Sequence, residues 1–160
     1  MNMTKQITVG LFLALLTFTS CKKDEPVEEP TVVTPTPTPS LYTRLGGINA
    51  ITAVTDKFIA NVVADNVINA RFAATASDEY RLKFFRGNLI DQICAGSGGP
   101  CQYKGKTMLE SHTGMNITDA EFSALVGDLV AALDFYSVPT QEKNELLAIL
   151  GPMSTDIVGH

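Results

Sequence analysis

The stretch Thr118-Asp-Ala-Glu-Phe-Ser-Ala-Leu-Val-Gly-Asp-Leu-Val-Ala-Ala-Leu133 decides the fold class. Its first four residues match a capping box, in which Thr118 and Glu121 reciprocally satisfy backbone amides at the start of a helix. Behind this cap, apolar side chains recur at steps of three and four residues, the spacing of one face of an α-helix. The residues on this face are Phe122, Leu125, Val126, Leu129, Val130 and Leu133.

The same spacing recurs on either side of this stretch. Residues 48–63 and about 78–94 each carry one apolar face, and a last helix is expected over about 140–150. Ser40 is placed to cap a short helix that begins at Leu41. No segment of the domain alternates apolar and polar residues with the period of two that is typical of a half-buried strand. The pattern therefore predicts an all-α domain.

The segment 102–117 differs from the rest of the domain because it is polar and is interrupted by Gly105 and Gly114. We expect a loop there, with at most a short helix. It contains His112, one of only two histidines; the other, His160, is the last residue and is expected to be mobile. A lone histidine in a polar loop is most often a surface residue, and the sharper alternative is an axial ligand of haem iron.

The N-terminus predicts export. Lys5 precedes a short apolar run over 10–20, the layout of a secretory signal, and the run is shorter than the roughly 20 apolar residues of a membrane-spanning helix. The residues Phe18-Thr-Ser-Cys21 resemble a bacterial lipobox, in which the cysteine is lipidated and becomes the first residue of the mature chain. The alternative is an ordinary signal peptide with an incidental cysteine.

Composition divides the chain into three parts. We expect a lipoprotein signal at 1–20, a lipidated cysteine with a Pro/Thr-rich spacer at 21–40, and one folded domain at 41–160. The charges at 22–25 resemble the tether of surface-exported bacterial lipoproteins. The expected location is therefore the cell envelope, anchored to the outer membrane on its periplasmic or surface face, with the lipid as the only membrane contact.

Net charge and cysteine usage restrict the partners. The chain carries a formal charge of −5 and has no basic run, so binding to nucleic acid is not expected. Export would leave Cys94 and Cys101 in an oxidising compartment, where a disulfide between them and two free thiols are both open alternatives. A zinc site is disfavoured because neither histidine is near this pair.

The stretch from Ser40 to Val158 resembles the truncated haemoglobins, specifically group I. The resemblance rests on Leu41-Tyr42-Thr-Arg-Leu-Gly-Gly47, on Gly98-Gly-Pro100 followed by Tyr103-Lys-Gly105, and on Ser111-His-Thr-Gly-Met-Asn-Ile-Thr118. The tail from Leu129 through Pro139 to Met153 also fits. The implied fold is a two-over-two helical sandwich enclosing haem b, with His112 as the proximal iron ligand. The haem contacts implied beside it are Phe58, Phe72, Phe85, Leu89, Tyr103, Met108, Ile117 and Leu125.

This sequence departs from the family on the distal side, where the gas ligand binds. The family commonly has a tyrosine at the position of Ile59 and a glutamine at that of Leu89. Ile59, Phe85, Leu89 and Leu125 are therefore expected to form an apolar distal pocket without a hydrogen-bond donor. The segment between Phe72 and Leu82 is longer than in typical members. A shifted register would bring Asn88 or Gln92 into the pocket, with Tyr80 or Lys83 at its rim.

The resemblance implies reversible binding of the diatomic gases O2, CO and NO. One alternative is an enzyme on the same scaffold, with redox, NO-detoxifying or peroxidase-like activity and a reductase as partner; the missing distal donors disfavour it. The other alternative is a haem-free helical module for interactions at the cell surface.

Overall fold

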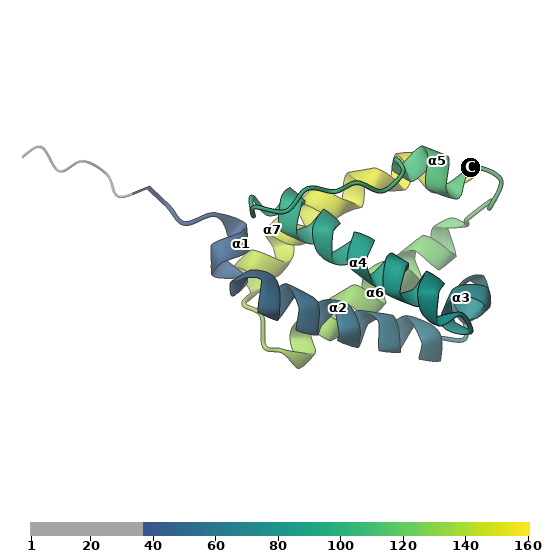
Figure 1. The fold of residues 1–160 in the computed structure, drawn as a ribbon, viewed down its shortest axis with the longest axis horizontal. Coiled ribbons are helices and arrows are strands. Elements are labelled where there is room, and N and C mark those ends of the chain that lie inside the picture. The colour runs from purple at the N-terminus through teal and green to yellow at the C-terminus, as the bar shows by residue number, and fades with distance from the viewer. Residues whose placement is uncertain (1–36) are drawn as a thin grey trace, which may run out of the picture. The chain divides into compact units, whose positions relative to one another are not determined.

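The computed structural model describes residues 37–160, and this part of the chain consists of helices joined by turns and irregular segments (Figure 1). It contains no named strand, so the predicted all-α class is confirmed. The predicted signal, Cys21 and most of the spacer lie outside the described residues. The elements are α1 (Leu41–Arg44), α2 (Gly47–Ala64), α3 (Asn69–Ala76), α4 (Glu79–Gly96), α5 (Met108–His112), α6 (Asp119–Phe135), α7 (Thr140–Leu150) and the 3-10 helix η1 (Gly151–Asp156).

The helix starts follow the capping signals in the sequence. Thr118 and Glu121 form the predicted capping box of α6, and the Ser40 hydroxyl accepts a hydrogen bond from the Thr43 amide at the start of α1. The sequence interpretation missed α3. Its eight residues, Asn-Ala-Arg-Phe-Ala-Ala-Thr-Ala, include one large apolar side chain, Phe72, and no buried residue, so they carry no repeating apolar face.

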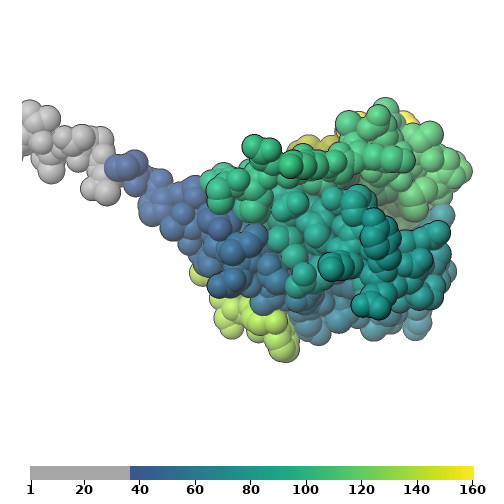
Figure 2. All heavy atoms as spheres, in the orientation of Figure 1, coloured from purple at the N-terminus to yellow at the C-terminus, as the bar shows by residue number. Residues whose placement is uncertain are grey.

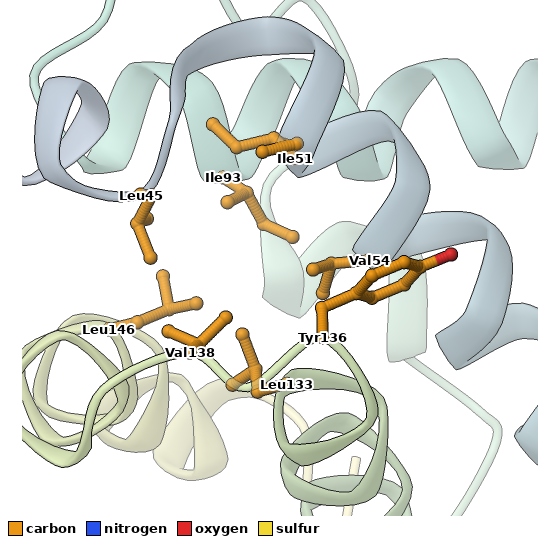
Figure 3. A pocket seen from close by; sticks show the side chains of 9 residues that line it. Leu45, Ile51, Val54, Ile93, Leu133, Tyr136, Val138 and Leu146 are labelled. Carbon is orange, nitrogen blue, oxygen red and sulfur yellow. The ribbon is translucent and has the colours of Figure 1, made fainter.

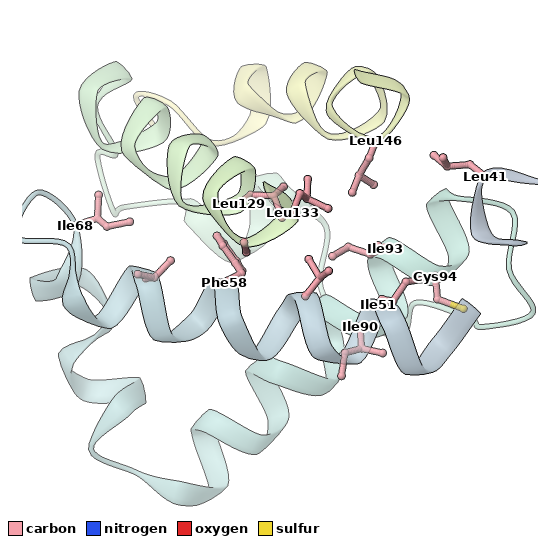
Figure 4. Close-up of a cluster of buried hydrophobic side chains, with 13 residues drawn as sticks. Leu41, Ile51, Phe58, Ile68, Ile90, Ile93, Cys94, Leu129, Leu133 and Leu146 are labelled. Carbon is pink, nitrogen blue, oxygen red and sulfur yellow. The ribbon is translucent and has the colours of Figure 1, made fainter. Parts of the chain in front are cut away.

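The core lies between two pairs of helices (Figure 4). Helices α2 and α4 form one pair, and α6 and α7 lie across them, as expected for a two-over-two sandwich. The buried side chains at the crossing are Ile51, Val54, Phe58 and Val62 of α2, Ile90, Ile93 and Cys94 of α4, Leu129, Ala132 and Leu133 of α6, and Leu146 of α7. Burial of each large aliphatic side chain contributes about 1.5–3 kcal/mol.

The end of the sandwich near α1 has a polar link and a small hollow. Arg44 of α1 donates hydrogen bonds to Glu142, at 2.8 Å, and to Glu145, which ties α1 to α7. An apolar hollow of about 200 Å³ lies beside this link, lined by side chains that include Leu45, Val54 and Ile93 (Figure 3).

Within residues 37–160, no helix is both long enough and apolar enough to cross a membrane.

Candidate functional site

A larger cavity, of about 480 Å³, separates α4 from α5. Its volume is within the range of small-molecule and cofactor pockets, about 300–1,000 Å³. Its walls come from α2, α3, α4, α5, α6, α7 and η1, and most of the lining side chains are apolar. The space-filling view shows the surface recessed where α4 faces the segment that follows α5 (Figure 2).

His112 lies at the last position of α5 and lines this cavity. Its Nδ1 is 2.7 Å from the carbonyl oxygen of Met108, one turn earlier in the same helix. Because a carbonyl oxygen can only accept, Nδ1 must carry the proton and donate it. In the neutral ring, Nε2 then keeps its lone pair. This is the state in which an imidazole coordinates a metal.

The loop around His112 is held at both ends. A capping box of Thr107 and Glu110 begins α5, and the Met115 amide donates to the His112 carbonyl at 2.9 Å. Beyond it, Ile117 pairs with Val158 in an isolated parallel bridge. The chain end joins this bridge, since the His160 carbonyl accepts a hydrogen bond from the Asn116 amide. The main chain of His160, which was expected to be mobile, is thus tied to the loop that follows His112.

The opposite wall is a face of α4. Phe85, Asn88, Leu89 and Gln92 recur at steps of three and four residues, and all four line the cavity. The Phe85 ring packs against Phe72 of α3, with 5.5 Å between ring centroids. The Gln92 amide nitrogen donates to the sulfur of Met153 at 3.2 Å and to that of Met108 at 3.6 Å.

The link between α4 and α5 is fixed by a disulfide and by a half-buried tyrosine, Tyr103. Cys94 and Cys101 form a disulfide, with 5.7 Å between their Cα atoms. Gly99 lies inside this loop, where a Cβ atom would come within 2.7 Å of the Cys94 sulfur, so only glycine fits. The Tyr103 hydroxyl donates to the Lys106 carbonyl at 2.8 Å, and burial raises the pKa of Tyr103.

The structure brings the predicted contact residues together. All nine line the cavity, namely Phe58, Phe72, Phe85, Leu89, Tyr103, Met108, His112, Ile117 and Leu125. Their contact with haem stays a prediction.

Ile59 is different, because it is half-buried against the hydrophobic core and is not among the lining residues. Consecutive helical residues point about 100° apart, and it is Phe58 that faces the cavity. Asn88 and Gln92 do line the cavity, whereas Tyr80 is 79% exposed and Lys83 lies outside the lining. The wall on α4 therefore carries two amides beside Phe85 and Leu89, and which of these side chains face a bound ligand stays a prediction.

Several lining residues were not identified from the sequence. The helical repeat of α6 already carried a signal for two of them, Phe122 and Val126, which share a face with Leu125. For Met115, Met153 and Ile157 no local signal exists, because they enter the cavity from irregular or 3-10 backbone. Arg71 and Glu121 also line it, and their pairing depends on the tertiary fold.

The metal-ligating side chains of the cavity suit a metal that needs a single protein ligand. Within residues 37–160, no cluster of three or more His, Cys, Asp or Glu side chains could hold a bare metal ion. The cavity instead offers a single imidazole in largely apolar surroundings, and haem iron needs only one such protein ligand. The residues present therefore fit haem, with His112 on one side and the α4 face on the other.

Comparison with known proteins agrees with this geometry. Residues 40–158 match the family model of the bacterial-like globins. The chain is 33% identical over 118 residues to the group 1 truncated hemoglobin GlbN of Mycolicibacterium paratuberculosis, covering 74% of this chain and 83% of the relative. It is 32% identical over 120 residues to the group 1 truncated hemoglobin of Tetrahymena pyriformis, covering 75% and 95%.

Solved structures show the same fold. The Fe(III) form of the truncated hemoglobin from Tetrahymena pyriformis superposes with a TM-score of 0.69 at 30% identity, covering 76% of this chain and all of that one. A 2/2 hemoglobin from Synechococcus, with a covalently attached heme, superposes with a TM-score of 0.68 at 27% identity, covering 75% and 98%. The predicted truncated globin fold is confirmed, and the chain belongs to the bacterial-like globins as a group 1 truncated haemoglobin.

Proposed function

We propose that this protein binds haem b in the 480 Å³ cavity, with His112 as the proximal ligand, and reversibly binds diatomic gases on the side of α4. The observation that carries the proposal is the His112 ring, whose Nδ1 is committed to the Met108 carbonyl while the ring lines a large apolar cavity. Bound haem would supply an iron with an open position for O2, CO or NO.

The protein's own residues would set how that position behaves. Phe58, Phe72 and Leu125 present apolar surface, which excludes water and favours uncharged ligands over ions. The Met108 carbonyl fixes the orientation of the His112 ring and raises its basicity as a ligand. These features support a gas-binding role, and no described residue is required to act as an acid or a base.

The test of haem binding is a titration of the purified protein with haemin, followed by absorption in the Soret region. Saturation at one haem per chain, and a shift of the band when CO is added to the reduced protein, are expected. A helical module without a cofactor would give no saturable band, and that outcome would contradict the proposal.

We further propose that the chain is exported and lipidated at Cys21, which would place the globin in the cell envelope on the outer membrane. The Cys94–Cys101 disulfide supports this location, since disulfides persist in oxidising compartments. Labelled palmitate should enter the wild-type chain and not the Cys21→Ser variant. Unprocessed, unlabelled protein as the main cellular species would contradict export and would leave haem binding unaffected.

A further inference from the structure

The polar side chains of the cavity wall are mostly engaged with one another or with the backbone. Arg71 is paired with Glu121, the Tyr103 hydroxyl donates to Lys106, and the Gln92 amide nitrogen donates to two methionine sulfurs. In the described part of the chain, the side chains of Thr75, Ser111 and Asn88 have no such hydrogen bond, and Asn88 is the amide among these three. It is half-buried and lines the cavity, and within residues 37–160 its side-chain amide has no hydrogen-bond partner.

Asn88 lies on the face of α4 that lines the cavity. It lies one turn after Phe85 and directly before Leu89, and all three belong to the face that lines the cavity across from α5, which carries His112. A group held by His112 on one wall would therefore present its open side toward this face. The amide brings two N–H donors to a wall that is otherwise formed there by Phe85 and Leu89.

We propose that Asn88 is the residue that selects the gas ligand, by donating an amide N–H to it. The inference rests on the proposed haem function. It supplies a hydrogen-bond donor to the gas ligand, which Ile59 and Leu89 cannot provide at the positions where the family commonly has tyrosine and glutamine. The amide has no side-chain partner within residues 37–160, so its N–H groups are free to donate to a ligand that accepts a hydrogen bond. Oxygen, which becomes polar when bound, accepts such a bond well, whereas carbon monoxide accepts it poorly.

Gln92 is the obvious competitor for this role, since it is also an amide on the same face. Its nitrogen is already directed at the sulfurs of Met108 and Met153, on α5 and η1, which are on the His112 side of the cavity. Thr75 of α3 also lines the cavity, and its hydroxyl is likewise without a side-chain hydrogen bond among the described residues. Both residues therefore provide matched controls.

The test uses the haem-loaded protein and the variants Asn88→Leu, Asn88→Ala, Gln92→Leu and Thr75→Val. Haem stoichiometry is measured first, then the C–O stretching frequency of the carbon monoxide complex by infrared spectroscopy, and last the oxygen dissociation rate by stopped flow. Removal of a donor raises the C–O frequency, so both Asn88 variants should shift it upward. They should also release oxygen about tenfold faster, equivalent to about 1.4 kcal/mol, while carbon monoxide release changes much less.

Each other outcome counts against the inference in a distinct way. If the Asn88 variants keep haem and both quantities match the wild type, Asn88 does not reach the ligand. If Gln92→Leu or Thr75→Val produces the shift instead, the donor has been assigned to the wrong residue. If the wild type takes up no haem, the proposed function itself fails, and that result is visible in the first measurement. Asn88→Leu and Asn88→Ala differ in side-chain size, so an effect that both variants share is not caused by one substitution disturbing α4.

Discussion

The guanidinium of Arg71 on α3 holds the carboxylate of Glu121 on α6 through two hydrogen bonds, of 2.7 Å from Nε and 3.1 Å from Nη2. Its third nitrogen, Nη1, donates to the Met115 carbonyl at 2.8 Å. Met115 belongs to the turn directly after His112, and Glu121 also caps α6. One side chain therefore joins α3, the start of α6 and the loop that follows the candidate iron ligand.

Replacing Arg71 with alanine should loosen haem. The substitution removes three hydrogen bonds that hold the His112 loop against the rest of the cavity. We expect haem to transfer to an acceptor globin several times faster than from the wild type, as followed by absorption. Arg81→Ala is the control, because Arg81 pairs with Asp78 at 3.5 Å in an exposed contact away from the cavity. Equal transfer rates for all three proteins would show that the Arg71 contacts do not retain haem.

The ion pair between Arg71 and Glu121 makes the stability of the folded state depend on pH. The hydrogen bond from Arg71 lowers the pKa of Glu121 from 4.5 to about 2, with the Thr118 amide and hydroxyl adding to the effect. A carboxyl whose pKa is depressed by folding stabilises the folded state above its unfolded pKa, and this contribution is lost as the pH falls from about 4.5 toward 2. The wild type should therefore lose stability more steeply over this range than Glu121→Gln, as measured by urea unfolding at a series of pH values. Parallel profiles would rule out the linkage.

The disulfide should stabilise the link between the two walls of the cavity. Cys94 and Cys101 are separated by seven positions, and closing a loop of this size contributes about 2.5 kcal/mol in the chain-entropy description. The Cys94→Ser/Cys101→Ser double variant should unfold at lower urea concentration. Dithiothreitol should lower the stability of the wild type and leave the double variant unchanged. An unaltered wild-type midpoint after verified reduction would mean that the surrounding contacts alone hold this link.

The long helices could be predicted from the sequence because local signals coincide with tertiary packing. In α6 the Thr118 cap and the repeat from Phe122 to Leu133 agree, and the helix spans Asp119–Phe135. Helix α7 begins directly after Pro139, as the proline indicates. The nine haem contacts, from Phe58 to Leu125, were implied by the family resemblance. All nine residues do line one cavity.

What the sequence did not predict depends on the fold in three dimensions. Helix α3 has one large apolar residue, Phe72, and no buried side chain. It therefore lacks the periodic apolar face from which a helix can be predicted. The role of Ile59 was assigned from its place beside Phe58, but the rotation of α2 directs Ile59 toward the core. Asn88 lines the cavity beside Phe85 and Leu89, because the orientation of α4 is set by its packing on α2 and α3.

The central claim is that His112 ligates haem iron, and its most direct test is the absorption spectrum of His112→Gly with and without imidazole. Glycine leaves space for free imidazole in place of the missing ring. We predict that the variant loses the wild-type Soret band when loaded with haem and that added imidazole restores it, while His160→Ala keeps the wild-type spectrum throughout. A wild-type spectrum from His112→Gly without imidazole would contradict the assignment of His112 as the iron ligand.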